Sequence, residues 1–345
     1  MTWTIPQYTK KRVDAAGAML IDDSVPFGQR ELAWTIADNW RSSHAYPLNH
    51  FQNLLRQKVA KVDPTGIVVQ RQKRRESIEL KLRDNPAMKL SQMQDLGGCR
   101  AILSDVGKVG EVIALFANSR MKHEIIRTFD YIREPKTSGY RGVHLVYRYR
   151  SDSERSRAYD GLRIEMQLRT ALQHAWATAV EVAGTFRGEA LKSGHGSSGW
   201  LRFFRLMGSE IALTEECPPV PGVPKSRDKL VEELRNRTQK LAAIDLLLGW
   251  TTSVNAIREG AVVRAHYYVI ELDSEARKVF LTGYKQGDLA DAQAHRAARE
   301  AEGRGQEGFD VVLVSVDKID QVRRAYPNYY LDTSVFVAEL RRAIS

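Results

Sequence analysis

The sequence predicts an α/β fold with a mixed sheet, followed by a small C-terminal α/β domain. In the first two thirds of the chain, two kinds of segment follow one another. Some have the helical spacing of apolar residues, and others are short runs in which apolar and polar residues alternate, as in a strand. Four prolines within residues 217–224 then interrupt the pattern, and a second set of helical and strand-like segments follows. We expect a domain over 1–217, a linker and long connecting helix over 218–260, and a small C-terminal domain over 261–345.

Length and composition narrow the class of protein. The 345 residues are enough for two domains with cores of their own. The chain contains no apolar run of the roughly 18 residues that a membrane span needs, and it begins with no secretory leader pattern. We therefore expect a cytoplasmic protein without a membrane partner. Cys99 and Cys217 are the only cysteines and lie far apart, which predicts neither a disulfide framework nor a structural zinc site.

The positive charge is concentrated in the first part of the chain. The net charge is +10, and residues 1–217 carry 33 Lys and Arg against 24 Asp and Glu. Residues 218–345 are almost balanced, with 19 against 18. An excess of cations on one part predicts a polyanionic ligand there, either a nucleotide or a nucleic acid.

The elements of the first part follow from periodicity. The helical segments 32–40 and 50–59 are separated by an expected break at Pro47. A strand at 67–70 leads into a basic, amphipathic helix through 71–83. Further helices are expected at 106–118, after 170 and at 200–213, and further strands up to 103 and at 124–132, 143–150 and 161–169.

The strand at 161–169 has one apolar face and one reactive face. Leu162, Ile164, Met166 and Leu168 alternate with Arg163, Glu165, Gln167 and Arg169. A carboxylate flanked by guanidiniums can hold a metal ion together with the phosphates bound to it. The alternative is a salt-bridged outer face without function.

Two other stretches carry related chemistry. Asp95 precedes the Gly97–Gly98 turn, which lets backbone approach a ligand closely, although an Asp cap on an ordinary turn would look the same. If the strands of Asp95 and Glu165 are neighbours, the two carboxylates could share Mg²⁺ bound to a nucleotide. The loop 133–144 interleaves three cations with an aromatic ring, as suits a purine nucleotide or a nucleic-acid end.

Four motifs together resemble the RelA/SpoT synthetase domain over roughly residues 25–215. The resemblance implies a nucleotidyltransferase-like fold that moves the β,γ-pyrophosphate of ATP onto a ribose 3′-hydroxyl and releases AMP. The motif residues are Arg71, Lys73, Ser77 and Lys81 in the first, Asp95 and Arg100 in the second, Lys136, Tyr140, Arg141 and His144 in the third, and Glu165, Gln167 and Arg169 in the fourth.

The resemblance also implies roles for these residues. Arg71 and Arg100 would sandwich the adenine of ATP, Lys73 and Lys81 would contact the ATP phosphates, and Ser77 would also belong to the ATP-binding residues. Asp95 would be the primary Mg²⁺ ligand, and Glu165 would help to hold Mg²⁺ and activate the attacking hydroxyl. Tyr140 would stack on the acceptor base, with Lys136 and Arg141 lining the acceptor side. His144, Gln167 and Arg169 would face phosphates or support the site.

The second half of the chain narrows the resemblance to one branch. None of the eight histidines is followed by Asp, so the hydrolase dyad of the long bifunctional members is not expected. The pattern after the prolines predicts a long helix at 226–258, a hairpin at 262–284, a helix at 288–302, a strand at 311–316 and a helix at 333–344. This layout resembles the fused toxin–antitoxin, or CapRel-type, branch, in which a Tyr-x-x-Tyr element blocks the ATP site. Tyr326 and Tyr329 match that element, with a hydrophobic plug as the alternative.

Three functions are therefore considered. The leading one is an autoinhibited pyrophosphokinase that modifies the tRNA 3′-CCA end and is released when a phage protein binds the C-terminal domain; no DNA partner is expected. The second is a small alarmone synthetase that makes (p)ppGpp from GDP or GTP. The third is a non-catalytic sensor of nucleotide or phage protein, which the presence of both Asp95 and Glu165 argues against.

Overall fold

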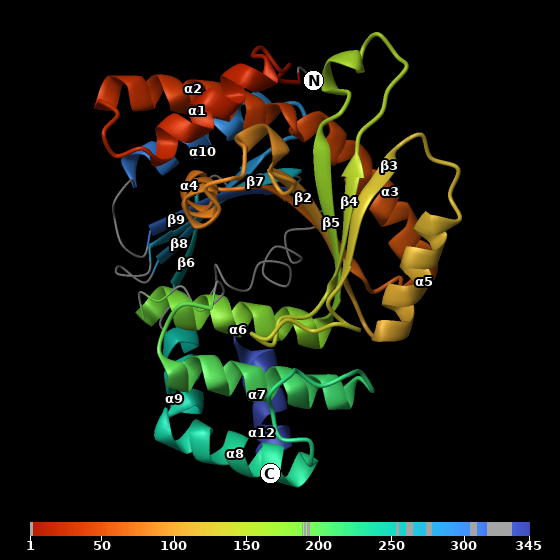
Figure 1. Ribbon diagram of the computed structural model, residues 1–345, viewed down its shortest axis with the longest axis vertical. Coiled ribbons are helices and arrows are strands. Elements are labelled where there is room, and N and C mark those ends of the chain that lie inside the picture. The colour runs from red at the N-terminus through yellow and green to blue at the C-terminus, as the bar shows by residue number, and fades with distance from the viewer. Residues whose placement is uncertain are drawn as a thin grey trace.

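The computed structural model describes residues 3–187, 189, 191, 194–252, 255–259, 265–273, 278–303, 309–315 and 333–345 (Figure 1). Its helices are α1 (Lys10–Ile21), α2 (Phe27–Ser43), α3 (Ala45–Val62), α4 (Arg75–Asp84), α5 (Val106–Ala117), α6 (Ala171–Arg187), α7 (Ser198–Thr214), α8 (Arg227–Lys240), α9 (Ala243–Thr252), α10 (Leu289–Glu302) and α12 (Ser334–Ile344). Its strands are β1 (Ile67–Gln72), β2 (Gly97–Leu103), β3 (Glu124–Asp130), β4 (Val143–Arg148), β5 (Arg163–Thr170), β6 (Asn255–Glu259), β7 (Tyr267–Asp273), β8 (Lys278–Tyr284) and β9 (Phe309–Ser315).

The described strands form one mixed sheet, which confirms the predicted fold class. Their order is β3-β4-β5-β2-β1-β9-β7-β8-β6. The pairs β2–β5 and β6–β8 are parallel, and the other neighbouring pairs are antiparallel. The C-terminal strands therefore continue the sheet of the first part, because β9 pairs with β1. The division into domains at 217 and 261 stays a prediction.

The apolar face of the sheet is covered by helices of the N-terminal part. Ile164, Met166 and Leu168 of β5 are fully buried, as the alternation predicts, and they share a core with α1, α2, α3 and α5. The opposite face keeps the polar side chains of β5 and turns toward α6, which crosses the opening of the curved sheet in Figure 1. Val182 and Phe186 of α6 pack against Val69 and Ile102 of the sheet, and Glu165 and Gln167 of β5 line a pocket on this face.

A second helical layer lies beyond α6. Helices α6, α7, α8, α9 and α12 share an apolar cluster, so the last helix of the chain packs among helices that precede it by 80 residues or more. The long helix predicted at 226–258 is wrong. It is divided at Ala242, whose φ is 47°, into α8 and α9, and β6 follows. The division lets Leu234 and Leu247 reach the same cluster from two directions.

Other boundaries differ in detail from the prediction. Pro47 does not break the chain but lies in the first turn of α3, where a backbone N–H would have no helical partner in any case. Helix α1 was not predicted, although Thr9 caps it by accepting from Arg12 N at 3.4 Å. The hairpin β7–β8, helix α10, strand β9 and helix α12 match the predicted C-terminal elements. Within the described ranges, no helix is long and apolar enough to span a membrane.

Candidate active site

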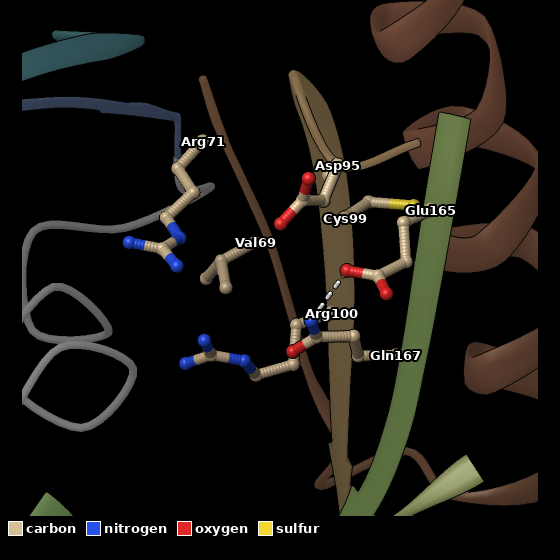
Figure 2. A pocket seen from close by; sticks show the side chains of 8 residues that line it. Val69, Arg71, Asp95, Cys99, Arg100, Glu165 and Gln167 are labelled. Atoms are coloured by element: carbon tan, nitrogen blue, oxygen red, sulfur yellow. Dashed lines mark hydrogen bonds between the residues drawn. The ribbon is translucent and has the colours of Figure 1, made fainter. Parts of the chain in front are cut away.

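The two predicted carboxylates come together because β2 and β5 are parallel neighbours. Gly98 lies opposite Glu165 in the register, and Asp95 stands directly before β2 on the same side. Figure 2 shows both carboxylates directed into one pocket. A Cβ on Gly98 would lie 3.6 Å from the Glu165 carbonyl oxygen, so glycine keeps the surface beside the carboxylates open without being required by sterics. The expectation that the two strands are neighbours is confirmed.

Asp95 is held by two lysines of the first motif. Its Oδ2 lies 2.8 Å from Lys73 Nζ, and its Oδ1 lies 2.9 Å from Lys81 Nζ. Burial alone would raise the pKa of Asp95, but the two ammonium groups outweigh burial and hold this pKa far below its usual range. Asp95 is therefore ionised at neutral pH, and two cations stand where the phosphates of a nucleotide would meet it.

Glu165 belongs to a chain of hydrogen bonds. His144 Nδ1 lies 2.9 Å from Glu165 Oε1, and the Tyr140 hydroxyl lies 2.6 Å from His144 Nε2. Because a carboxylate only accepts, His144 carries a proton on Nδ1, and in the neutral ring Nε2 accepts from Tyr140. Gln167 Nε2 donates to Glu165 Oε2 at 2.7 Å, and Arg169 Nη2 donates to Gln167 Oε1 at 3.3 Å.

These contacts keep Glu165 ionised and oriented. Burial would raise the pKa of Glu165, but the contacts with His144 and Gln167 outweigh burial, and the pKa lies below its ordinary value. A carboxylate that is fixed on both oxygens can accept a proton, or share a metal ion, with little reorganisation.

Arg71 and Arg100 lie on the same face of neighbouring strands. In the register, Val69 faces Arg100 and Arg71 faces Gly98, so the two guanidiniums stand on either side of Val69. Figure 2 shows both guanidiniums reaching away from the strands on the pocket side. This placement is compatible with the predicted adenine sandwich, which stays a prediction.

A larger cleft opens beside this pocket. It has a volume of about 1040 Å³ and extends from β1 and α4 to α6. A cleft of this size accommodates a nucleotide. Six of the predicted site residues line the cleft: Arg71, Lys73, Ser77, Lys81, Asp95 and Lys136. Of these, Ser77 and Lys81 lie on α4.

The acceptor side contains a group of rings around Lys136. Its Nζ lies 4.4 Å from the ring centre of Tyr131 and 5.4 Å from that of Tyr140. Burial lowers the pKa of Lys136. Phe129 stacks on Tyr131 with ring centres 5.7 Å apart. Phe129 of β3 and Tyr131, just after β3, were not predicted as site residues, although their two-residue spacing in the strand predicted at 124–132 placed them on one face.

The structure does not bring every predicted residue to the open site. Arg141 is 2% exposed, and its guanidinium donates to the backbone carbonyls of Ile132 at 2.9 Å and of Pro218. It therefore fastens the loop at 133–144 to the segment after α7, which corrects its expected place on the acceptor side. Burial was the missing information, because an Arg between two glycines looks exposed in a sequence. Tyr326 and Tyr329 lie outside the described residues.

The residues present fit the expected Mg²⁺. This ion prefers one or two carboxylates and completes its coordination with substrate phosphates and water. Asp95 and Glu165 provide that donor set, and the described part of the chain contains no cluster of three or more His, Cys, Asp or Glu that would form a closed metal site. An open pair of carboxylates is the arrangement expected for a metal ion that arrives with a nucleotide.

Comparisons with known proteins find one family model and several similar proteins. Residues 70–187 match a family model described as the region found in RelA/SpoT proteins. GTP pyrophosphokinase YjbM of Bacillus subtilis is 30% identical over 93 residues, which are 27% of this chain and 43% of that protein. The chain therefore spans less than half the length of this curated relative.

Two solved structures are also similar to this chain, both at low sequence identity. A GTP pyrophosphokinase family protein from Streptococcus pneumoniae has a TM-score of 0.40 and 24% identity, covering 58% of this chain and 92% of that one. Small alarmone synthetase 2 from Bacillus subtilis has a TM-score of 0.42 and 20% identity, covering 51% and 91%. Residues 70–187 are thus similar to the region found in RelA/SpoT proteins, and five residues of the predicted motifs line one pocket there: Arg71, Asp95, Arg100, Glu165 and Gln167.

Proposed function

We propose that the protein is a pyrophosphokinase that transfers the β,γ-pyrophosphate of ATP to a ribose 3′-hydroxyl. One observation carries the proposal: Asp95, just before β2, and Glu165, on the adjacent parallel strand β5, line one pocket with Arg71 and Arg100, and Asp95 directly contacts Lys73 and Lys81. The transferred group is highly charged, so catalysis consists mainly of positioning and of cations aimed at developing charge. Mg²⁺, held by Asp95 and Glu165 when bound, would supply further positive charge to the phosphates.

The protein side chains divide the remaining work. Lys73 and Lys81 exchange part of their contact with Asp95 for the ATP phosphates. Glu165 accepts the proton of the acceptor hydroxyl, and the imidazole of His144 keeps its Oε1 oriented at 2.9 Å. Tyr140 holds the tautomer of His144 through the hydroxyl contact at 2.6 Å.

The acceptor is a guanosine nucleotide or a tRNA end, and a specific feature favours the tRNA end. Arg148 and Arg163 lie directly opposite each other on β4 and β5, on the same face as Glu165, and Arg127 of β3 shares that face. Like charges in opposite positions destabilise a sheet. Glu124, 3.2 Å from Arg148, and the Gln92 carbonyl oxygen, 2.7 Å from Arg163, offset part of this repulsion, and a bound polyanion would offset more. Three cations on the same face as Glu165 suit the phosphates of a nucleic-acid strand whose end lies at Glu165.

The fused toxin–antitoxin organisation is part of this proposal. In this organisation the C-terminal segment restrains the enzyme, and Tyr326 and Tyr329 block the ATP site. Binding of a phage protein would release the enzyme. Helix α12 packs in the apolar cluster of α6 and α7, so deleting the C-terminal segment would uncover that cluster. Point variants of the full chain therefore test restraint better than truncation.

The test uses γ-labelled ATP with the full chain and offers GDP, GTP and deacylated tRNA in parallel. Label on any acceptor, lost when Mg²⁺ is chelated, supports a pyrophosphokinase. Label on tRNA that disappears when the terminal adenosine is removed supports the tRNA acceptor, whereas label on GDP or GTP alone identifies an alarmone synthetase. Arg163→Gln should then weaken transfer to tRNA and leave transfer to GTP unchanged. No label on any acceptor, even with Tyr326 and Tyr329 replaced by alanine, would refute the proposal.

A further inference from the structure

The C-terminal segment contacts three consecutive residues at the end of β1, directly before Lys73 of the candidate site. Strand β9 pairs with β1 at Gln70 and Arg71. Arg296 of α10 donates through Nη1 to Gln72 Oε1 at 2.7 Å. The next residue is Lys73, whose ammonium group binds Asp95. The contacting residues of α10 and β9 thus lie more than 220 positions later in the chain than the end of β1. They adjoin the place where the chain passes from β1 to α4.

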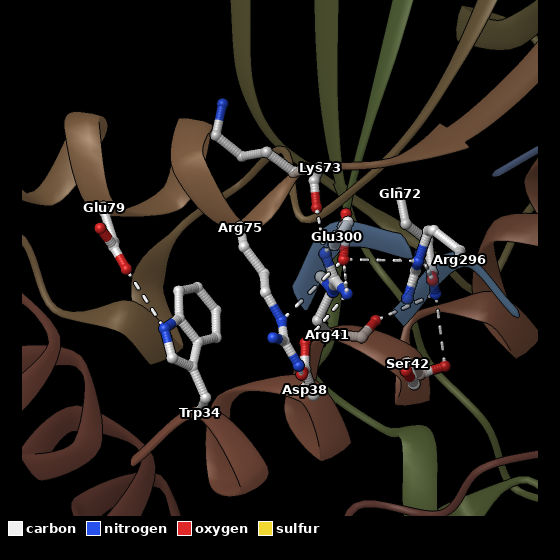
Figure 3. Close-up of polar contacts among 10 residues, drawn as sticks. All are labelled: Trp34, Asp38, Arg41, Ser42, Gln72, Lys73, Arg75, Glu79, Arg296 and Glu300. Carbon is white, nitrogen blue, oxygen red and sulfur yellow. Dashed lines mark hydrogen bonds and ion pairs between the residues drawn. The ribbon is translucent and has the colours of Figure 1, made fainter. Parts of the chain in front are cut away.

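Arg41 of α2 connects α10 to Lys73 directly (Figure 3). Its Nη1 donates to the Lys73 carbonyl oxygen at 3.1 Å and to Glu300 Oε1 at 3.2 Å. Its Nη2 lies 2.9 Å from Glu300 Oε2 and 2.9 Å from Asp38 Oδ1. The Arg41 side chain is 1% exposed, so these protein groups are its surroundings. A bidentate carboxylate such as Glu300 fixes the plane of a guanidinium, and hence the direction of its other donors.

Glu300 supplies one of the two negative charges of the cluster. Three guanidiniums, those of Arg41, Arg75 and Arg296, meet two carboxylates, those of Asp38 and Glu300. Burial would raise the pKa of Glu300, but Arg41 and Arg296 together outweigh burial and hold this pKa below its ordinary value. Without the Glu300 charge, three buried cations would share one carboxylate, and they would move apart or admit water.

Lys73 would respond to such a movement because the cluster holds its backbone. Its N–H donates to the Leu96 carbonyl oxygen at 2.9 Å, its carbonyl accepts from Arg41, and its Nζ reaches Asp95. Helix α4, which carries the second lysine of the pair, begins only two residues later at Arg75. A displaced Arg41 therefore releases one of the three attachments of Lys73.

We propose that Glu300 of α10 is a positioning residue for the ATP phosphates: through Arg41 it holds Lys73 in place, so the C-terminal segment completes the nucleotide site. The identity of the ligand rests on the proposed function, whereas the mechanical link does not. It follows that any partner that displaces α10 weakens nucleotide binding by loosening residues 72–76.

The experiment compares full-length wild type with Glu300→Gln, and uses Glu302→Gln as the matched control. Glu302 lies on the same helix, but its side chain is 60% exposed and pairs with Arg299 at the surface. We expect Glu300→Gln to raise the Kd of MgATP and the KM for ATP about tenfold, the factor for about one hydrogen bond to a charged group. The kcat and the acceptor KM should not change, and hydrogen exchange in residues 72–76 should rise without any nucleotide.

Each outcome decides the proposal. Unchanged hydrogen exchange in residues 72–76, or an unchanged Kd in a folded variant, overturns it, as does an equal effect of Glu302→Gln. If Glu300→Gln does not fold, Glu300→Asp takes its place under the same criteria, because it keeps the charge but falls one methylene short of Arg41. A wild type that binds no MgATP refutes the proposed function, and the hydrogen-exchange comparison then decides the positioning role separately.

Discussion

Replacement of Glu165 by glutamine is the sharpest test of the catalytic face. The glutamine oxygen can still accept from His144 Nδ1, but its NH₂ group would meet Gln167 Nε2, which donates to Glu165 at 2.7 Å. Gln167 can avoid two facing donors by rotating its amide, and it then withdraws its oxygen from Arg169 Nη2. The net structural cost is about one hydrogen bond, or about 1–2 kcal/mol of the free energy of unfolding.

This cost is small beside the expected loss of activity. A decrease of about 1–2 kcal/mol lowers the Tm of a domain of this size by about 2–8 °C, so the variant remains folded at 25 °C. Loss of the proton acceptor lowers kcat about 10²–10⁴-fold, and the shared metal ligand is lost with it. The KM for ATP should change less, because Arg71, Lys73 and Lys81 are untouched.

The assay measures label transfer from γ-labelled ATP, with thermal unfolding of the same preparations. Glu111→Gln serves as the control, because Glu111 is exposed on α5, beyond the apolar core that separates α5 from the site. It removes one carboxylate from the surface and should leave both kcat and Tm unchanged. Folded Glu165→Gln with more than about one tenth of the wild-type kcat would remove Glu165 from the mechanism.

Three further predictions test the surroundings of the site. Tyr140→Phe keeps the ring but removes the hydroxyl that holds His144 at 2.6 Å, so kcat should fall up to about tenfold with the acceptor KM unchanged; Tyr140→Ala should raise the acceptor KM as well, and equal KM values for both variants would contradict stacking. Gly139→Ala should destabilise the fold by about 1–3 kcal/mol, because Gly139 has a φ of +99° and a Cβ there would lie 2.9 Å from a backbone oxygen; in urea unfolding, Gly110→Ala on α5, where nothing lies within 4 Å, should instead stabilise by up to about 1 kcal/mol. Burial lowers the pKa of His44 to about 4, so stability from its neutral form is fully present above the unfolded pKa of about 6.5 and is lost as pH falls toward 4. The loss should reach about 3 kcal/mol in urea unfolding, and a His44→Asn variant with the same pH slope would show that another group titrates.

Local pattern was sufficient for the reactive strand and its neighbours. The alternation in β5 placed Ile164 in the core and Glu165 on the open face, because successive side chains of a strand point to opposite sides. Asp95 and the basic start of α4 were predicted from their residue types and motifs, not from alternation. Their meeting with Glu165 depended on one non-local condition, the pairing of β2 with β5, which the sequence left open.

Tertiary structure alone decided the rest, and the physical reason is separation along the chain. Arg141 lies in a loop that looks exposed, yet its donors are taken by carbonyls that fold back from 132 and 218. Glu300 lies on a helix whose periodicity predicts only a charged face, and it becomes a buried partner of Arg41 across 259 positions. Periodicity reports which face of an element is apolar, whereas the partner of a buried charge is chosen by packing between elements. The sequence by itself therefore determined the chemistry of the site, and the three-dimensional structure decided which distant residues hold that chemistry in place.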